Sequence, residues 1–305
     1  MRVLVTGASG FAGRYMCSFL GIQPERPRVY GIDIVAPIHP DCEWFRTVDV
    51  TDGKAVMEVV RNTSPDCIVH LVGVFGGGDA QETYRVNVLS MTALMEAVRE
   101  HTPQAVVVAA GSAAEYGLVP EVRMPIAEST ACQPVSPYGL SKLLATEAAL
   151  YYFRTHGVQV AIARPFQLIG KGVTPKLAPG AFALQLAEAL AGERQVVRVG
   201  NLDSRRDFID VHDFTEAVWA LCRHPAPGEV FNVCSGNGVQ IGVLLEMMIE
   251  ESGACVSCET DPSRLIGTVD ASVVVGDYHK IEAHCGWRPR RDLRQSIETM
   301  FESES

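Results

Sequence analysis

Long apolar runs are missing from this sequence of 305 residues. No stretch reaches the roughly 18 consecutive apolar residues that a membrane-spanning helix needs. An excess of positive charge is missing too, because the formal net charge is −10 at pH 7. The overall electrostatic field therefore repels the phosphates of nucleic acids and of anionic lipids. We expect no membrane and no nucleic acid among the partners, and any phosphate-bearing ligand must be held by a local structural feature.

We expect no cleavable leader either. The chain begins MRVLVT and enters a glycine-rich turn at once, which leaves no room for a charged region, an apolar region and a cleavage site. The expected location is therefore the cytoplasm.

A disulfide framework is not indicated by the cysteines, which are nine in number and scattered through the chain. Such cysteines are typical of buried thiols in a reducing compartment. Cys255 and Cys258 form the only CxxC spacing, and a structural zinc site would need a second pair or histidines at ligand spacing. We therefore predict no metal site.

Short apolar runs rich in β-branched residues do recur along the first half of the chain, and segments with helical periodicity separate them. Strands that are apolar on both faces and alternate with helices predict a doubly wound α/β fold, a parallel Rossmann sheet covered on two sides. The expected strands are 2–6, 29–34, 67–72, 105–110 and 158–163, and the expected helices include 83–100 and 141–155.

Three glycines follow the first expected strand and open the next helix. Small residues there let the backbone approach a pyrophosphate, and the helix N-terminus supplies free N–H groups and a positive dipole. Tight strand-to-helix turns also use glycine for steric reasons alone, so the triplet by itself is a weak signal. The turn predicts a dinucleotide site that includes Gly7, Gly10, Phe11, Ala12 and Gly13.

Asp33 ends the second expected strand, about twenty residues past the last glycine. A carboxylate at this place accepts hydrogen bonds from the adenosine ribose hydroxyls in dinucleotide-binding folds. The alternative is a solvated aspartate at a strand end. Because a carboxylate repels a 2′-phosphate, we expect NAD as the cofactor and regard NADP as less favoured.

Tyr138 and Lys142 lie four residues apart, a spacing that a helix places on one face. An ammonium beside a phenol lowers the pKa of the tyrosine, as a general acid/base working near neutral pH requires. YxxxK occurs by chance in many chains, but here we expect it to open a helix immediately downstream of a strand, in a chain that already carries the dinucleotide turn. We predict this pair to be catalytic. Ser112 follows the strand 105–110, where open α/β sheets bind ligands, and is the expected hydrogen-bond donor to a substrate oxygen.

The motifs together resemble the extended short-chain dehydrogenases, the NAD-dependent epimerase/dehydratase family that modifies nucleotide sugars. The glycine spacing GxxGxxG is that of the short-chain dehydrogenases, and the resemblance covers essentially the whole chain. The 199–213 and 232–236 motifs are most similar to the enzymes of GDP-mannose conversion. The motifs are TGASGFAG at 6–13, GSAAEYG at 111–117, SPYGLSK at 136–142, ARPF at 163–166, VGNLDSRRDFIDVHD at 199–213 and NVCSG at 232–236.

The resemblance implies further contacts. Arg206 is expected to bind the nucleotide diphosphate, a task that suits a guanidinium fork; the alternative is a surface arginine paired with Asp207 or Asp210. Asn87 matches a family asparagine near the active site. The remaining expected cofactor contacts are Asp49, placed by the resemblance against the adenine amine, Val50 and Leu71.

The chain departs from the family pattern at two substrate positions. Gln167 stands where the family usually has asparagine after Arg-x-Phe, and Gly267-Thr268 stands where it has an Arg-Pro pair. Arg264, three residues upstream of Gly267, is the candidate replacement for the missing guanidinium. If neither replacement works, the nucleotide is not GDP or the substrate is not a nucleotide sugar. Gly76-Gly77-Gly78 also gives the loop over the active site unusual freedom.

Three reactions use this machinery. Family dehydratases carry an acidic residue two positions after the serine, whereas this chain has Ala114 there, and Glu115 points to the other side if the segment is extended. Dehydration is therefore the least favoured. The sequence favours a reductase that delivers hydride to the 4-keto group of a GDP-linked sugar while Tyr138 protonates the oxygen. The alternatives are an epimerase with tightly bound NAD and a dinucleotide-binding module without turnover.

The expected organisation is a dinucleotide-binding domain over 1–165, to which segments around 210–235 return, and a smaller substrate-binding cap over 166–305 with helices at 182–191 and 241–251. Many family members dimerise through the helices after the fourth and fifth strands, so we expect a homodimer. Met91, Leu94, Met95, Leu144 and Ala148 on these helices are equally explained as intrachain core.

Overall fold

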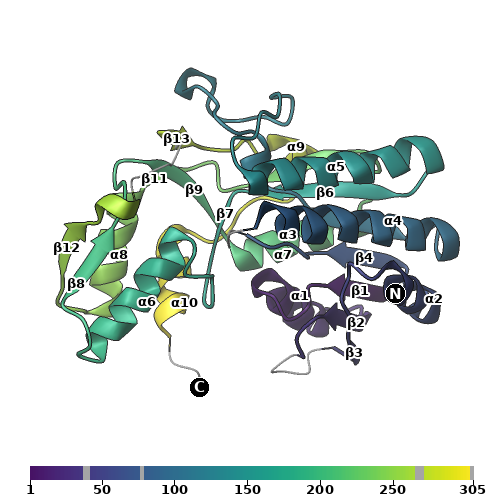
Figure 1. The fold of residues 1–305 in the computed structure, drawn as a ribbon, viewed down its shortest axis with the longest axis horizontal. Helices are drawn as coiled ribbons and strands as arrows, with labels where there is room; N and C mark the ends of the chain where they lie inside the picture. The colour runs from purple at the N-terminus through teal and green to yellow at the C-terminus, as the bar shows by residue number, and fades with distance from the viewer. Residues whose placement is uncertain (37–41, 76–78, 265–270, 303–305) are drawn as a thin grey trace.

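A seven-stranded parallel sheet forms the centre of the computed structural model, which describes residues 1–36, 42–75, 79–264 and 271–302 (Figure 1). Its strands are β1 (Arg2–Thr6), β2 (Arg28–Asp33), β3 (Trp44–Thr47), β4 (Cys67–His70), β5 (Val106–Ala110), β6 (Val160–Pro165) and β10 (Val230–Val233). Their spatial order is β10-β6-β5-β4-β1-β2-β3. The chain adds strands outward on one side of β1 as far as β3 and then continues on the other side from β4. Ligands of such folds bind at the carboxyl ends of the strands beside this switch point.

Two layers of helices cover the sheet (Figure 1). Successive residues of a strand point to opposite faces, and both faces of β1 are apolar: Val3 and Val5 pack against one layer and Leu4 against the other. One layer contains α1 (Phe11–Gly21), α7 (Val211–Arg223) and α9 (His279–Cys285). The opposite layer contains α2 (Gly53–Thr63), α3 (Ala80–Tyr84), the π-helical turn η1 (Arg85–Leu89), α4 (Ser90–His101) and α5 (Pro137–His156).

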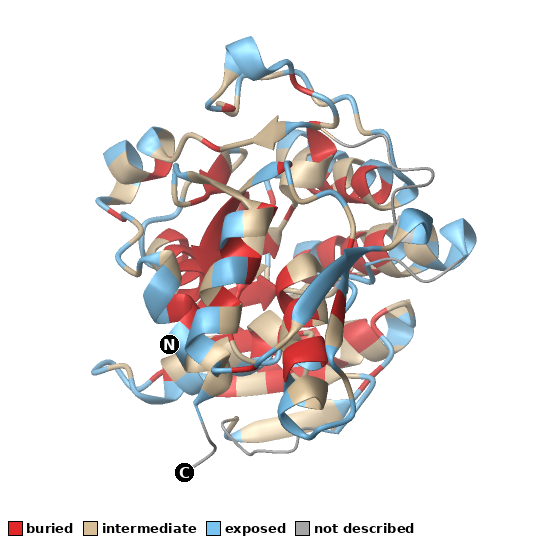
Figure 2. Cartoon of the chain, turned by 90° about the vertical axis from the view of Figure 1, so that its left-hand side faces the viewer, coloured by how far each residue is buried: buried red, intermediate tan, exposed pale blue. Residues whose placement is uncertain are grey.

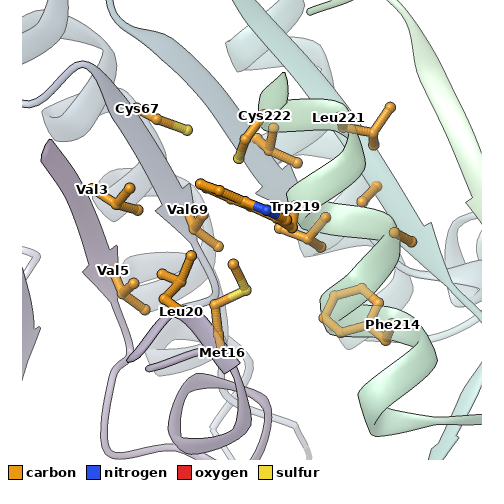
Figure 3. Close-up of a cluster of buried hydrophobic side chains, with 14 of the residues drawn as sticks. Val3, Val5, Met16, Leu20, Cys67, Val69, Phe214, Trp219, Leu221 and Cys222 are labelled. Atoms are coloured by element: carbon orange, nitrogen blue, oxygen red, sulfur yellow. The ribbon is translucent and has the colours of Figure 1, made fainter. Parts of the chain in front are cut away.

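Figure 3 shows the apolar cluster beneath the first of these layers. Met16 and Leu20 of α1 and Phe214 and Trp219 of α7 meet there over the valines of β1 and β4. Figure 2 shows the same division over the whole chain, since the central strands and inward helix faces are buried and the outward helix faces are exposed. Burial of this kind supplies most of the stability of a domain.

A smaller set of strands and helices follows β6 and forms a third apolar cluster (Figure 1). Four strands form one sheet, and two parallel strands form another. The first sheet contains β7 (Gln167–Ile169), β9 (Arg205–Asp210), β11 (Gly238–Gln240) and β13 (Val273–Val274). The second contains β8 (Val196–Val199) and β12 (Ser257–Thr260), and the helices are α6 (Ala178–Leu190), α8 (Ile241–Ser252) and α10 (Leu293–Phe301). Three short 3₁₀ helices are η2 (Ala113–Glu115), η3 (Glu121–Arg123) and η4 (Pro262–Arg264).

The Rossmann sheet predicted from the sequence is confirmed, with differences in detail. α5 begins at Pro137 rather than Ser141, and residues 111–136 separate it from β5, so it does not follow that strand directly. Within 210–235, β10 pairs with β6 in the large sheet and α7 packs on α1. The division into two domains at residue 165 stays a prediction. Across the described residues, the helices are all too short or too polar to cross a membrane.

Candidate active site

The turn between β1 and α1 leaves little or no room for a side chain at its three glycines. Gly7 has φ +75°, a conformation that favours glycine. A Cβ on Gly13 would lie 1.9 Å from the Gly7 carbonyl oxygen, and a Cβ on Gly10 would lie 3.1 Å from the same atom. The turn therefore brings bare backbone and the N–H groups of α1 to the carboxyl edge of the sheet, and this cradle fits the pyrophosphate of a dinucleotide.

Asp33 lies beside this turn at the end of β2. Its carboxylate accepts hydrogen bonds from the backbone N–H of Ser9 at 3.0 Å and from that of Val35 at 3.3 Å. Ser9 also donates its hydroxyl hydrogen to the Val35 carbonyl oxygen at 2.8 Å. Asp33 is thus fixed next to the pyrophosphate cradle, where a carboxylate contacts an adenosine ribose.

The other expected cofactor residues lie on neighbouring loops. Asp49 follows β3, and its hydrogen bonds with the backbone and hydroxyl of Thr51 hold the pKa of its carboxyl below the usual value. Val50 is buried. Leu71 lies directly against the glycine turn, since a Cβ on Gly7 would be 3.1 Å from its carbonyl carbon.

Ser112 and Tyr138 meet at the wall of a cavity of about 360 Å³. Ser112 follows β5 and caps η2, while Tyr138 lies in the first turn of α5, whose N-terminus is capped by the Ser136 hydroxyl. The two side chains are hydrogen-bonded to each other. Gln167 of β7 and Arg206 of β9, in the smaller part of the fold, line the same cavity. The cavity therefore joins two hydroxyls, an amide and a guanidinium in one space.

Lys142 lies behind the cavity wall and is buried. Its ammonium donates hydrogen bonds to the carbonyl oxygens of Ala110 at 3.0 Å and of Val72 at 3.4 Å. Burial lowers its pKa to about 8, against an opposing effect of the Glu115 carboxylate. The ammonium is thus anchored by the end of β5 and by the segment after β4.

The expectation that Lys142 lowers the pKa of Tyr138 is wrong for this structure. Burial raises the pKa of the phenol above its usual value, the hydrogen bond with Ser112 lowers it, and the Glu115 carboxylate raises it. Loss of solvent and the negative charge of Glu115 together disfavour the phenolate more than Ser112 favours it. Tyr138 therefore keeps its proton at neutral pH.

The segment after β4 links the dinucleotide cradle to the catalytic residues, a connection that the sequence motifs did not reveal. Leu71 lies against Gly7, and Val72 accepts a hydrogen bond from Lys142. Phe75 lines the cavity, and its ring packs edge-on against the Tyr138 ring with centroids 4.9 Å apart. Residues 76–78, which are the glycine triplet, lie outside the described residues.

Asn87 holds this segment in place from the π-helical turn η1. Its amide is buried and exchanges hydrogen bonds with the backbone of Val74, at 2.8 Å to its N–H and 3.3 Å to its carbonyl oxygen. It also donates to the Ser141 hydroxyl at 2.8 Å. These three bonds occupy the amide, and Asn87 is not among the residues that line the cavity. We propose that it supports the site rather than contacts substrate.

The two carboxylates that could have paired with Arg206 are engaged elsewhere. Asp207 accepts hydrogen bonds from the N–H groups of Ser235, Gly236 and Gly276, and Asp210 interacts with His212. Arg206 lines the cavity together with Gln167, and its contact with a substrate diphosphate stays a prediction. The side chain of Arg264 and residues 267 and 268 lie outside the described part of the chain.

A family comparison agrees with this geometry: the profile of the NAD dependent epimerase/dehydratase family matches residues 3–234. The chain belongs to this family. GDP-6-deoxy-D-mannose reductase of Pseudomonas aeruginosa is 28% identical over 98% of this chain and 96% of its own length. dTDP-6-deoxy-L-talose 4-dehydrogenase (NAD(P)(+)) of Kitasatospora kifunensis is 28% identical over 100% of this chain and 96% of its own length. The solved structure of RMD from Pseudomonas aeruginosa complexed with NADPH matches with a TM-score of 0.87 and 27% identity, over 98% of this chain and 97% of that chain.

Membership of the epimerase/dehydratase family confirms three predictions made from the sequence: the family itself, the Rossmann fold and a nicotinamide dinucleotide as cofactor. The protein is therefore an enzyme of this family, and it depends on NAD(P). The glycine cradle, Asp33 and Lys142 are the residues of this chain that fit such a cofactor.

His70, at the end of β4, is a buried histidine of this family member that the sequence motifs did not single out. Its Nδ1 lies 2.7 Å from the Thr6 hydroxyl, while its Nε2 is buried without a hydrogen-bond partner. Burial, assisted by the positive charge of Lys142, lowers its pKa to about 3. His70 is therefore neutral in the folded protein over the physiological range.

From the burial of His70 we predict that acid destabilises the protein. Below about pH 6.5 the unfolded chain binds a proton at His70 that the folded chain does not bind, so the free energy of unfolding falls as the pH falls toward 3. We expect a loss of about 2 kcal/mol from this residue between pH 7 and pH 5. Urea unfolding of the parent and of His70→Gln at both pH values measures it. The variant should lose less stability than the parent, whereas His224→Gln at the surface should match it; equal losses in all three proteins would contradict the prediction.

Metal binding finds no support at the CxxC spacing. Cys255 and Cys258 are both exposed. Within the part of the chain that the structure describes, no three histidine, cysteine or acidic side chains gather as metal ligands would.

Proposed function

We propose that this protein reduces the 4-keto group of a nucleotide-linked 6-deoxy sugar, with GDP as the favoured nucleotide. The observation that carries the proposal is that Ser112, Tyr138 and Arg206 line one and the same cavity. It offers a proton donor and a hydrogen-bond donor for a carbonyl oxygen and a guanidinium for a diphosphate. The names of the relatives from Pseudomonas aeruginosa and Kitasatospora kifunensis support a sugar of this class.

In the proposed reaction, each residue of the cavity has a distinct task. When bound, the reduced nicotinamide supplies a hydride to the carbonyl carbon. Tyr138 gives its proton to the carbonyl oxygen, so that a ketone becomes a secondary alcohol. Ser112 donates a hydrogen bond to the same oxygen, and Lys142 places a positive charge behind the phenol. Arg206 binds the diphosphate and thereby orients the sugar.

Tyr138 can begin the proposed reduction with its proton. A group that must donate a proton at neutral pH has to hold that proton beforehand, and burial keeps Tyr138 protonated. Dehydration would need an acid at position 114, and this residue is an alanine on the cavity wall. Glu115 does not replace it, because the segment turns as η2 instead of continuing extended, and Glu115 is fully buried.

The experiment is a panel of 4-keto-6-deoxy sugars linked to GDP, dTDP and UDP, offered with NADH or NADPH. Reduction predicts one oxidised dinucleotide per alcohol formed, fastest with the GDP-linked sugar. An epimerase would instead convert a nucleotide sugar to its epimer without net oxidation and would carry NAD after purification. Absence of turnover with every sugar, despite dinucleotide binding, would overturn the proposal in favour of a binding module.

Asp33 leads us to propose that NADH is used in preference to NADPH. A carboxylate beside the glycine turn repels the 2′-phosphate of NADPH. We expect Asp33→Ser to raise the affinity for NADPH relative to NADH by about tenfold, which corresponds to about 1.4 kcal/mol. Fluorescence titration with both dinucleotides measures this ratio. Asp203→Ser, an exposed aspartate on another part of the chain, is the control, and a parent protein that binds NADPH more tightly would contradict the assignment.

We also propose that the protein is a homodimer through the helical segments after β4 and β5, which are η1 with α4, and α5. Met91, Leu94 and Met95 belong to the intrachain core, as the alternative interpretation held. Exposed leucines on η1 and α5 remain for a partner copy; they are Leu89, Leu140 and Leu144. Light scattering should give twice the mass of one chain.

A further inference from the structure

A buried ion pair lies directly behind the two hydroxyls of the cavity. Glu115, at the end of η2, and Arg164, in β6, are joined by an Oε2–Nη2 hydrogen bond of 2.6 Å, and their side chains are 0% and 4% exposed. Burying two charges costs more solvation energy than the pair commonly recovers, and apolar residues of the same size often serve stability equally well. The presence of this ion pair is therefore weak evidence that its only role is to stabilise the fold.

Glu115 acts on Ser112 through its second carboxylate oxygen. Its Oε1 accepts a hydrogen bond from the backbone N–H of Ser112 at 2.7 Å. The chain also leaves space for this oxygen, because a Cβ on Gly111 would lie 2.6 Å from it. One carboxylate thus ties the Ser112 backbone to β6 and so fixes where the Ser112 hydroxyl meets Tyr138.

Glu115 also acts on the two proton-bearing groups of the site. Its negative charge raises the pKa of Tyr138 and that of Lys142, although it is not among the residues that line the cavity. The other ionisable groups that face Glu115 are the Arg164 guanidinium and the Cys132 thiol. Burial, and then the Glu115 charge, raise the pKa of the Cys132 thiol. Neither the guanidinium nor the thiol is among the groups that shift the pKa of Tyr138 or Lys142.

We propose that Glu115 is a positioning residue of the reduction: clamped by Arg164, it fixes Ser112 against Tyr138 and sets one negative charge behind Tyr138 and Lys142. The inference rests on the proposed function, because reduction is the direction in which Tyr138 must begin with its proton. Glu115 does this without contact with the substrate. Its charge extends the pH range in which both groups stay protonated.

The test replaces Glu115 by glutamine, which keeps an oxygen acceptor for the Ser112 N–H and removes the charge. We expect kcat to fall and the fall to steepen with pH, so that the ratio of kcat/KM at pH 9 to that at pH 7 drops about threefold or more below the parent ratio. KM for the sugar nucleotide should change little, because Arg206 and Gln167 are untouched. Glu115→Gln with Arg164→Met should shift the profile in the same direction, and it avoids a lone buried guanidinium if the single variant folds poorly.

A second measurement does not need sugar turnover. Lys142 fits the dinucleotide, so the affinity for NADH should begin to weaken at a lower pH in Glu115→Gln than in the parent. Glu128→Gln is the matched control, since Glu128 is a half-buried carboxyl that bonds the Asn232 N–H and does not act on Tyr138 or Lys142.

The outcomes separate the two proposals. A parent that reduces no keto sugar, with a shifted NADH affinity profile in Glu115→Gln, would sink the proposed function and support the role of Glu115. An active parent whose pH profiles match those of both Glu115 variants would overturn the role of Glu115 and leave the proposed function intact.

Discussion

Replacing Tyr138 by phenylalanine should lower the rate of hydride transfer to the keto sugar by about 10²–10⁴-fold, the usual contribution of a general acid. The phenol is the proton donor at the cavity wall, and its hydroxyl is hydrogen-bonded to Ser112. The ring is retained, so its edge-on contact with Phe75 and the packing of the first turn of α5 should persist. Single-turnover kinetics under saturating dinucleotide measures the rate.

The control for this variant is Tyr151→Phe. Tyr151 lies on the same helix, is exposed, and contacts only neighbouring rings among the aromatic pairs of the described residues. We expect parent-like rates for it, and parent-like NADH affinity and thermal unfolding for both variants. A Tyr138→Phe protein that transfers hydride at the parent rate would remove Tyr138 from the mechanism.

Replacing Gly13 by alanine should weaken dinucleotide binding by roughly 10-fold to 100-fold. The new methyl group would lie 1.9 Å from the Gly7 carbonyl oxygen and 2.8 Å from the Ala8 Cα, so α1 has to move away from the turn. Overpacking of this kind costs about 1–3 kcal/mol, and a displaced helix N-terminus no longer presents its N–H groups to the pyrophosphate. Isothermal titration with NADH measures the loss.

Gly21→Ala is the matched control in the same helix. A Cβ on Gly21 meets nothing within 4 Å, and alanine is a better helix former than glycine by about 1 kcal/mol. This variant should bind NADH like the parent and unfold at the same or a higher temperature. Equal affinities of Gly13→Ala and Gly21→Ala would mean that the glycine turn is not where the dinucleotide binds.

Tyr138 and its surroundings show which properties of the site follow from the local sequence and which depend on the tertiary structure. The spacing of Tyr138 and Lys142 predicted a shared helix face correctly, because helical geometry depends only on sequence separation. The protonation behaviour was predicted in the wrong direction, because it depends on burial. The Phe75 ring, on the segment after β4, packs edge-on against the Tyr138 ring, and Gln167 and Arg206 of the smaller part of the fold line the same cavity. No motif near Tyr138 encodes these neighbours.

The sequence by itself determined the parallel sheet, the glycine cradle, Asp33 at the end of β2 and the identity of the hydroxyls, because periodicity and motif spacing are local properties of the chain. Only the tertiary structure decided which of these groups meet. The partners that organise the site are 49 residues apart for Glu115 and Arg164, 54 for Asn87 and Ser141, and 64 for Thr6 and His70. Contacts over such separations arise when strands and helices distant in sequence become neighbours, so their energies and pKa shifts exist only once the tertiary structure has formed.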